Sequence, residues 1–406
     1  MTGLPIIDGC TGCGACAQSC AKKAITICED KEGFFIPKVD EEKCVNCGLC
    51  EKRCHVLHKP QHDLSKQKNY AVINYKDRKV SSSGGAFSMM ARYVLGKRGV
   101  VFGAAYEPSF PNVQHIAVER LEDLDRLRGS KYVQSRIGNA YKLVKDFLKQ
   151  GRMVLFSGTP CQIGGLYAFL NGKRYDGQLI TLDLVCHGVP NQTVFRTYLT
   201  KLERSSKKIS PKARNIVGFR FRNLDSWDYR PAVQISKPKT WLILDQEDNV
   251  YMSAFFRGSI YRESCFNCHY ANCERMGTLT IADFWGIGKH GAKFQKNVAS
   301  GISLVIDNDG ILKSIQSELE DVYIEERTLE EALYENSNLK HPVERPKERD
   351  TAITDMLNPG VTLLAYAQKY NMLEGNIKHF IKKNVKNIIY ALGIYNIYKS
   401  LKYKLQ

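Results

Sequence analysis

The sequence predicts a multidomain protein of the α+β / α/β class, in which a small cysteine-rich N-terminal module precedes an α/β domain with a largely parallel sheet. Three observations carry this prediction. Two identically spaced cysteine runs occupy the first 54 residues. Between residues 139 and 204, helical patterns alternate with buried strand patterns. The length of 406 residues suits two or three domains.

The two cysteine runs have the ligand spacing of a two-cluster bacterial ferredoxin. Each run reads Cys-x2-Cys-x2-Cys-x3-Cys, and the second begins 24 positions after the last cysteine of the first. A 4Fe-4S cluster needs four thiolates, of which one run supplies three and the other run supplies the fourth. The expected ligand sets are Cys10, Cys13, Cys16 and Cys54 for one cluster, and Cys44, Cys47, Cys50 and Cys20 for the other.

Zinc sites and disulfides are the alternatives for these cysteines. Zinc sites typically use well-separated Cys-x2-Cys pairs, and disulfides need only an even number of cysteines. The complete spacing occurs twice, which favours clusters over both. The proline that commonly follows the fourth cysteine is replaced by Ala21 and His55, but this removes no ligand. Cys28 is left over and is expected to be a small buried hydrophobe.

Composition indicates a protein of the reducing cytoplasm. Hydrophobic residues make up 43% of the chain, which is enough for a sizeable core. Fourteen cysteines in this pattern, with no apolar N-terminal signal segment, do not fit a secreted disulfide scaffold. No run approaches 18 apolar residues, so no membrane-spanning helix is expected. The net charge of +17 favours acidic partners: nucleic acid, anionic lipid or an acidic redox protein.

Four segments are expected along the chain. Residues 1–58 form the cysteine-rich module, and a polar stretch at residues 59–69 links it to the rest. Residues 70–145 and 146–312 form the two parts of the α/β domain. Residues 313–406 form a helical tail that becomes basic.

The α/β pattern is clearest where two strands are each followed by a loop and a helix. The strands cover residues 153–156 and 179–185, and the loops cover residues 157–162 and 186–190. Parallel strands bring such loops to one edge of the sheet, where open α/β sheets bind their ligands. Each loop contains a cysteine, so we expect the functional site at this edge.

The tail carries two helical predictions. Residues 318–336 are acidic and are expected to form a helix. Beyond Glu374 no acidic residue occurs, and lysines alternate with apolar residues at the spacing of a basic amphipathic helix. Such a helix could make a peripheral contact with an anionic membrane, although packing on its own protein is the favoured interpretation.

A glycine-containing loop before the predicted helix 86–95 is a candidate phosphate site. Gly84 and Gly85 follow three serines, and the start of a helix offers unpaired backbone N–H groups. Residues 129–135 add a lysine and hydroxyl groups of the kind that phosphate sites use. A phosphate or a flavin diphosphate would fit, against the alternative that the glycines only cap the helix.

Five cysteines outside the module carry further chemistry. Cys161 stands at the head of a helix, where a thiolate is favoured, and Cys186 precedes His187, a common proton donor. Three more share the short spacing of metal ligands: Cys265, Cys268 and Cys273. Cys161 or Cys186 could supply the fourth ligand of a third metal site, either a 4Fe-4S cluster or zinc.

With these motifs in view, the chain resembles the beta-subunit family of coenzyme F-420 hydrogenases and dehydrogenases. It is most similar to bacterial members with an N-terminal two-cluster ferredoxin module. The resemblance covers residues 1 to about 310 and depends on five separated motifs that occur in order. These motifs lie at residues 81–86, 129–135, 157–162, 186–190 and 262–285.

The resemblance implies an iron–sulfur flavoprotein oxidoreductase. FAD would bind in the α/β domain, exchange electrons with the clusters and exchange a hydride with a small-molecule substrate. The implied cofactor-binding residues are Ser83, Gly84, Gly85, Lys131, Tyr132, Gln134, Ser135, Thr159 and Gln162. The implied catalytic residues are Cys161, Cys186 and His187. Relatives occur among polysaccharide-synthesis proteins, which makes that metabolism one candidate source of the substrate.

Three functions compete on this reading of the sequence. The first is an oxidoreductase with its own small-molecule substrate. The second is an electron-transfer subunit that serves a partner enzyme and has no substrate of its own. The third, a metal-stabilised nucleic-acid binder, is not expected. An electron-donor protein such as a ferredoxin is the expected partner, because the positive charge of the chain would favour its docking.

Overall fold

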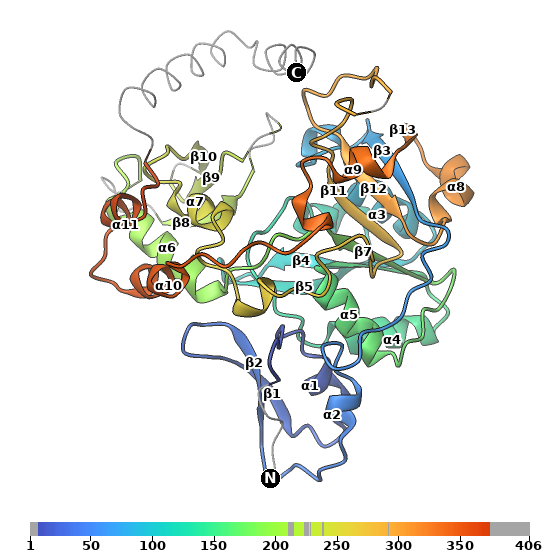
Figure 1. Cartoon of the computed structure of the whole chain (residues 1–406), viewed down its shortest axis with the longest axis horizontal. Coiled ribbons are helices and arrows are strands. Elements are labelled where there is room, and N and C mark those ends of the chain that lie inside the picture. Colours follow the sequence, from blue (N-terminus) through green and yellow to red (C-terminus); the bar gives the residue numbers. More distant parts are fainter. Residues whose placement is uncertain are drawn as a thin grey trace.

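The computed structural model describes residues 7–209, 215–222, 227, 229–237, 239–290 and 292–373. The predicted basic amphipathic helix beyond Glu374 lies outside the described residues. Figure 1 shows a small N-terminal module below a body built on one large sheet, with a smaller lobe beside that body. None of the described helices has the length and apolar character needed to cross a membrane.

The N-terminal module is a β-hairpin with two short helices. Its elements are α1 (Ala15–Ser19), β1 (Ile25–Glu29), β2 (Phe35–Val39) and α2 (Leu49–Lys52). Each helix begins inside a cysteine run, directly after Gly14 (φ 77°) or Gly48 (φ 69°). Glycine adopts this left-handed backbone without a steric penalty. The two runs therefore fold alike, as their identical spacing predicts.

The body contains an eight-stranded sheet in the order β13-β3-β12-β11-β7-β6-β4-β5. The strands are β3 (Lys68–Asn74), β4 (Val100–Tyr106), β5 (Val113–Val118), β6 (Val154–Gly158), β7 (Leu179–Leu184), β11 (Leu279–Asp283), β12 (Ser303–Asp307) and β13 (Val322–Arg327). The pairs β11–β7, β7–β6 and β6–β4 are parallel, whereas the pairs on both flanks are antiparallel. The predicted largely parallel sheet is thus confirmed only for the core, and the whole sheet is mixed.

Helices cover both faces of this sheet, because its central strands are apolar on both faces. The three helices are α3 (Ala86–Gly96), α4 (Ala140–Lys149) and α5 (Pro160–Phe169). Val101 and Leu155 pack in the cluster that contains α3. The residues that follow them, Phe102 and Phe156, pack with α4 and α5 on the other face. This alternation is the ordinary consequence of the two-residue period of a strand.

A second lobe forms around a three-stranded antiparallel sheet. Its elements are α6 (Gln192–Ser205), β8 (Ile216–Arg220), β9 (Ala232–Ile235), β10 (Thr240–Ile243), α7 (Val250–Phe256), α10 (Arg349–Leu357) and α11 (Leu363–Lys369). Aromatic rings fill its core, with Phe195 edge-on to Phe219 at a centroid distance of 5.2 Å. The lobe draws residues from both the predicted 146–312 segment and the predicted tail.

The predicted helix at residues 318–336 is wrong. Residues 322–327 instead form β13, which pairs antiparallel with β3 at the edge of the main sheet. Only α9 (Leu329–Leu333) is helical in that segment, and α8 (Ile311–Ile315) precedes it. Acidic residues on an edge strand face solvent as readily as those on a helix, so the charge pattern did not distinguish the two.

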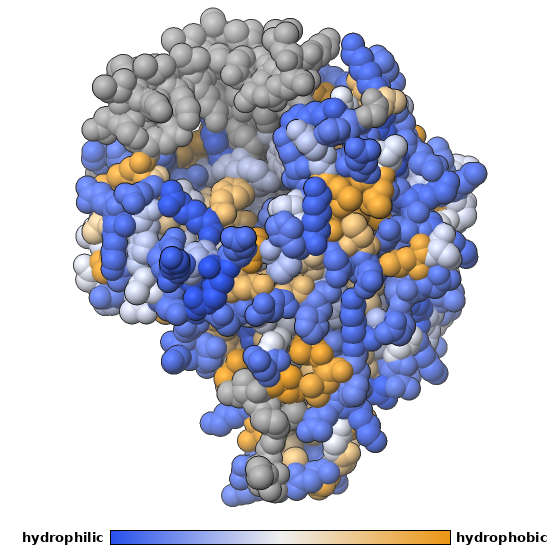
Figure 2. Space-filling view, viewed as in Figure 1, coloured by the Kyte–Doolittle hydropathy of each residue, from blue (hydrophilic) through white to orange (hydrophobic). Residues whose placement is uncertain are grey.

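The module docks on α5 at two adjacent glycines. A Cβ atom at Gly165 would lie 2.9 Å from Sγ of Cys13, and one at Gly164 would lie 2.2 Å from the hydroxyl oxygen of Tyr270. That hydroxyl is hydrogen-bonded to Nδ1 of His55 at 2.7 Å. On the face shown in Figure 2, hydrophobic residues gather where the module meets the body. The two glycines therefore permit the close approach of the module.

We predict that Gly164→Ala weakens this docking. The added methyl group would displace the buried Tyr270 hydroxyl and break its hydrogen bond to His55, at a cost of about 1–3 kcal/mol. The expected results are a lower unfolding temperature and faster proteolytic cleavage in the 59–69 linker. Gly96→Ala in α3 is the matched control, because a Cβ there meets nothing within 4 Å. Equal unfolding temperatures and cleavage rates for the two variants would contradict the prediction.

Candidate functional site

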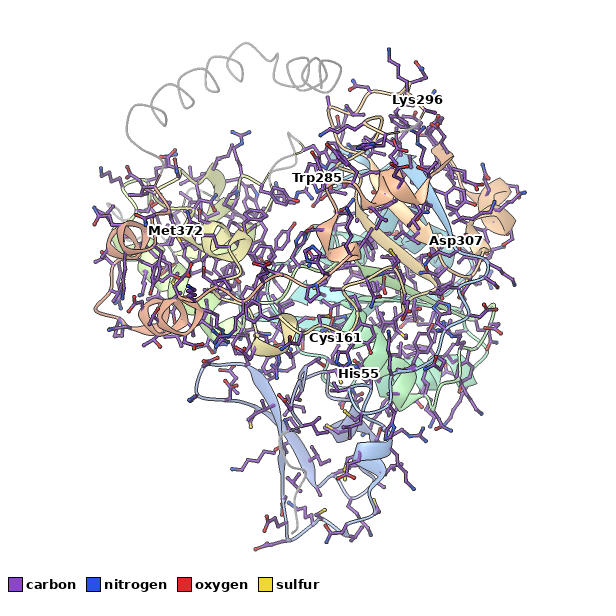
Figure 3. The ribbon with its side chains drawn as sticks, in the orientation of Figure 1. His55, Cys161, Trp285, Lys296, Asp307 and Met372 are labelled. Atoms are coloured by element: carbon purple, nitrogen blue, oxygen red, sulfur yellow. The ribbon has the colours of Figure 1, made fainter. Side chains whose placement is uncertain are left out.

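A cavity of about 300 Å³ lies at the carboxyl ends of the parallel strands, as the sequence predicts. Its walls include the residues that end β6, β7 and β11, and residues of the second lobe complete it. The loop before α3 and residues 127–135 line it as well. In the view of Figure 3, Cys161 lies between His55 of the module and Trp285, which also lines the cavity.

Most of the predicted cofactor-binding and catalytic residues line this one cavity. They are Ser83, Gly85, Lys131, Tyr132, Gln134, Ser135, Thr159, Cys161, Gln162, Cys186 and His187. Gly84 is the exception. A Cβ atom there would lie 2.1 Å from the carbonyl oxygen of Val72 and 2.3 Å from the amide nitrogen of Ser303. Gly84 is therefore required for the close packing of the loop on β3 and β12, and it does not face the cavity.

A buried ion-pair network holds the serine-containing loop in place. Asp77 accepts hydrogen bonds from Arg92 at 2.5 Å and from Arg128 at 2.6 Å. Burial would raise the pKa of Asp77, but hydrogen bonds from Arg92 and Asn74 and the charges of both arginines hold this pKa below its usual value. The backbone carbonyl of Asp77 also accepts a hydrogen bond from the hydroxyl of Ser81. The loop wall of the cavity thus depends on one carboxylate.

Lys131 does not offer its charge to the cavity in this conformation. Its ammonium group donates to three backbone carbonyls, those of Arg126 at 3.3 Å, Leu127 at 3.0 Å and Arg128 at 2.8 Å. These carbonyls end the 3-10 helix over residues 121–126, so the lysine caps that turn. Burial lowers the pKa of Lys131 to about 7. The prediction that Lys131 supplies a phosphate-binding cation is corrected accordingly.

The predicted Thr159, Gln162 and Ser135 form one polar network that positions α5. The backbone N–H of Thr159 donates to Oε1 of Gln162, which closes a capping box at the start of α5. Nε2 of Gln162 donates to the hydroxyl of Ser135 at 3.0 Å, and this hydroxyl is hydrogen-bonded to Nδ1 of His115 at 2.9 Å. These bonds satisfy most polar groups of the network. The network therefore fixes the place of Cys161 at the head of α5.

Sequence reasoning missed a polar and aromatic wall formed by the second lobe. Arg222 donates to Oδ2 of Asp283 at 2.6 Å, and the indole N–H of Trp227 donates to Oδ1 at 2.6 Å. Trp227 stacks on Trp285 at 4.5 Å, and the guanidinium of Arg222 lies 4.7 Å from the ring centre of Tyr229. Asp283 ends β11, the third parallel strand to reach this edge, which is the one signal that could have identified it.

His187 projects into the cavity and is exposed there. Desolvation by the surrounding protein lowers the pKa of His187, and the negative charge of Asp283 partly opposes this shift. The two residues come from loops at the ends of β7 and β11. The histidine and the aspartate therefore act on the same part of the cavity.

Four buried cysteine sulfurs lie together beside the cavity. Burial raises the pKa of Cys161 to about 11 and that of Cys265 to about 12, and the charge of Cys268 adds to both shifts. Burial also raises the pKa of Cys186, with further contributions from the other three. Such mutual effects require short separations between the sulfurs. The raised pKa values also contradict the expectation of a free, activated thiolate at Cys161 or Cys186.

Cys273 does not belong to this group. Its Sγ donates to the carbonyl oxygen of Leu339 at 3.2 Å. Burial raises its pKa, and the other influences come from Arg275 and Lys340 rather than from another cysteine. The structure thus brings together Cys161, Cys186, Cys265 and Cys268, instead of the predicted set that combined Cys265, Cys268 and Cys273 with one further cysteine.

The sulfurs of the module follow the crossed pattern that the spacing predicts. Burial raises the pKa of Cys16 to about 12, and the charges of Cys10, Cys54 and Cys50 contribute to this shift. The backbone N–H of Ala24 donates to Sγ of Cys20 at 3.4 Å. Within the described residues, no three His, Cys, Asp or Glu side chains are arranged for a single metal ion. A four-iron cube holds its ligand sulfurs farther apart than a single ion does.

Comparisons with known proteins agree with these two parts of the molecule. Residues 9–57 match the family described as 4Fe-4S dicluster domain. Residues 151–332 match the family described as the C-terminal part of the coenzyme F420 hydrogenase/dehydrogenase beta subunit.

Two individual proteins show more limited similarity. The B component of the Na(+)-translocating ferredoxin:NAD(+) oxidoreductase complex of Acetobacterium woodii is 48% identical over 46 residues, which cover 11% of this chain and 13% of that protein. The chain therefore spans about an eighth of the length of this curated relative. A polypeptide in a structure of the F420-reducing [NiFe] hydrogenase complex from Methanosarcina barkeri aligns with a TM-score of 0.42 and 14% identity, over 73% of this chain and 94% of that one.

The matched module and the matched body define an iron–sulfur electron-transfer protein of the oxidoreductase class. The chain belongs to the coenzyme F420 hydrogenase/dehydrogenase beta-subunit family, with an N-terminal module for two 4Fe-4S clusters.

We predict that Asp77→Asn destabilises the protein by about 3–5 kcal/mol, because it leaves two arginines beside a buried site without their carboxylate. Thermal unfolding under anaerobic conditions measures the effect. Asp125→Asn is the matched control, since Asp125 also pairs with Arg128 but is exposed, and the loss of an exposed pair costs about 0–1 kcal/mol. The prediction fails if the Asp77 variant unfolds at the temperature of the control.

Proposed function

We propose that the protein is an iron–sulfur flavoprotein that passes electrons between its clusters and FAD in order to reduce or oxidise a small molecule. One observation carries this proposal: Cys161 and Cys186 belong both to the wall of the cavity and to the four-cysteine group that faces the module. A redox group in the cavity would therefore lie directly beside a site for a further redox group. Metal clusters and flavins are the groups that such an arrangement suits.

The cavity has features that fit a phosphate-bearing cofactor. The hydroxyl of Ser82 is buried in its wall and has no hydrogen-bond partner in the described structure. Gly129 has a left-handed backbone (φ 78°), and nothing lies within 4 Å of where its Cβ would be. The 11-residue helix α3 begins at the same wall with unpaired N–H groups. These groups would hold the diphosphate of FAD, and Tyr132 would pack against its rings.

FAD, when bound, supplies two-electron chemistry together with single-electron exchange. The chain's own contribution is to position the reactants. The capping box of α5 holds Thr159 at the cavity wall, and the ion pair between Arg222 and Asp283 fixes the aromatic wall opposite. We propose that His187 contacts the substrate, because its exposed side chain projects between these walls. Cys161 and Cys186, predicted as catalytic residues, are reassigned to the metal-ligand role.

The third metal site is proposed on Cys161, Cys186, Cys265 and Cys268. All four thiols are free, and they are brought together from the ends of β6 and β7 and from the 265–268 turn. Four sulfurs with no other metal-binding side chain suit a 4Fe-4S cluster or zinc. The cluster is the version that fits an electron path, because the charge of Cys161 also acts on Cys13 of the module. Zinc cannot change its oxidation state.

An electron-transfer subunit without its own substrate is the second candidate. The exposed Cys47 and Val45, the latter 59% exposed, favour it, because they offer the outer cluster to another protein. Both candidates need an electron-carrier protein as partner, and a ferredoxin is the first to test. Reoxidation of the reduced flavin by an added small molecule, with no partner present, distinguishes the first candidate from the second. Precursors of polysaccharides are the first substrate class to test.

We predict about twelve irons and one flavin per chain in anaerobically purified protein, on the basis of four irons per cluster. Serine substitution of Cys265 or Cys268 should remove about four irons and leave the module loaded. Cys273→Ser is the matched control and should keep all twelve, because its sulfur only donates to Leu339. Eight irons in the unaltered protein would exclude the third cluster. Protein that contains iron but no flavin would refute the flavoprotein assignment.

A further inference from the structure

Arg262 occupies the junction between the module and the four-cysteine group. Its side chain is only 6% exposed. Its Nε donates to the carbonyl oxygen of Cys10 at 2.8 Å, and its backbone N–H donates to the carbonyl oxygen of Val189 at 3.0 Å. The first contact reaches the first cluster loop of the module, and the second reaches the loop that carries Cys186. One residue therefore joins both sets of cysteines.

The guanidinium of Arg262 has an unfulfilled donor. Its Nη1 atom is buried and has no hydrogen-bond partner in the described part of the chain. Nor does Arg262 form an ion pair there with a carboxylate, because the neighbouring Glu263 pairs with Arg345 at 2.7 Å instead. A buried N–H group without an acceptor is costly, and a charged one more so. Nη1 therefore requires an acceptor that the protein alone does not supply.

The surroundings of Arg262 indicate what that acceptor is. Its positive charge acts on the sulfurs of Cys161 and Cys265, so the guanidinium lies close to both. The ring of Phe34, 5.6 Å from the guanidinium carbon, provides an apolar neighbour rather than an acceptor. A cluster held by the four cysteines would place negatively charged sulfur atoms beside the orphaned N–H group.

We propose that Arg262 donates a hydrogen bond from Nη1 to a sulfur of the cluster held by Cys161, Cys186, Cys265 and Cys268, and thereby raises the reduction potential of that cluster. This inference rests on the proposed third cluster. A positive charge and a hydrogen bond at the sulfurs stabilise the more negative, reduced state. Each transfer moves one electron from the module, which is oxidised, to the inner site, which is reduced, and no bond forms or breaks. Arg262 is thus a positioning residue that favours inward electron flow.

The test compares Arg262 variants of the full chain by redox titration monitored by electron paramagnetic resonance. Arg262→Gln should keep twelve irons and the flavin but lower the potential of the inner cluster. The expected change is at least tenfold in its one-electron equilibrium constant, which corresponds to about 59 mV. Arg262→Lys, which keeps the charge but loses the forked donors, should give a smaller shift. Arg345→Gln is the matched control, since Arg345 is half-exposed and pairs with Glu263.

A second measurement requires no loss of the arginine. In unaltered protein that contains ¹⁵N-labelled arginine, pulsed resonance of the reduced inner cluster should show a nitrogen coupling that Arg262→Lys removes. Twelve irons with an unchanged inner potential in Arg262→Gln, or no such coupling, would overturn this inference and leave the third cluster standing. Eight irons in the unaltered protein would overturn the third cluster and this inference together.

Discussion

The rest of the structure depends on the close packing of buried sulfurs where the N-terminal module meets the sheet. Single-electron transfer weakens steeply with distance, so the two parts must touch. Glycines on α5 allow this approach, with Sγ of Cys13 directly against Gly165. Hydrogen bonds from Arg262 to Cys10 and from Gln134 to Thr11 then fix the first cluster loop. Each of these contacts is made by a residue far away in the sequence.

The burial that brings the sulfurs together also makes them depend on metal. Burial raises the pKa of Cys16 and Cys265 to about 12 each, so both are neutral thiols when no metal is bound. Metal ligands must be deprotonated, and a bound metal supplies the positive charge that makes this favourable. Folding of the junction and loading of the clusters are therefore coupled. This coupling links the stability of the module to the redox function of the whole chain.

The sequence predicted those features that depend on local chain geometry. The spacing of each cysteine run, with Gly14 or Gly48 at the start of the short helix, specifies the cluster loops without reference to the rest of the fold. The apolar runs of β6 and β7 predicted parallel strands and the edge at which the cavity opens. Confirmation of the family and of the dicluster module follows from the same motifs.

Features that depend on long-range pairing could not be predicted in the same way. Cys273 shares the spacing of Cys268, and only the three-dimensional structure shows that its sulfur turns to Leu339. Lys131 has the composition of a phosphate ligand, but three backbone carbonyls bind its ammonium group first. The strand at residues 322–327 exists because β3 offers it an edge, which the acidic pattern does not reveal. In each case, a distant partner determines the outcome.

The most direct test of this account is the magnetic coupling between the inner four-cysteine site and the module. If the sulfurs form one continuous path, the spectrum of the fully reduced chain should show splitting or broadening that is absent when only one cluster is reduced. Replacement of Cys268 by serine should abolish that interaction and leave only the coupling within the module. Spectra that are simple sums of independent clusters, in protein that contains all twelve irons, would contradict the account.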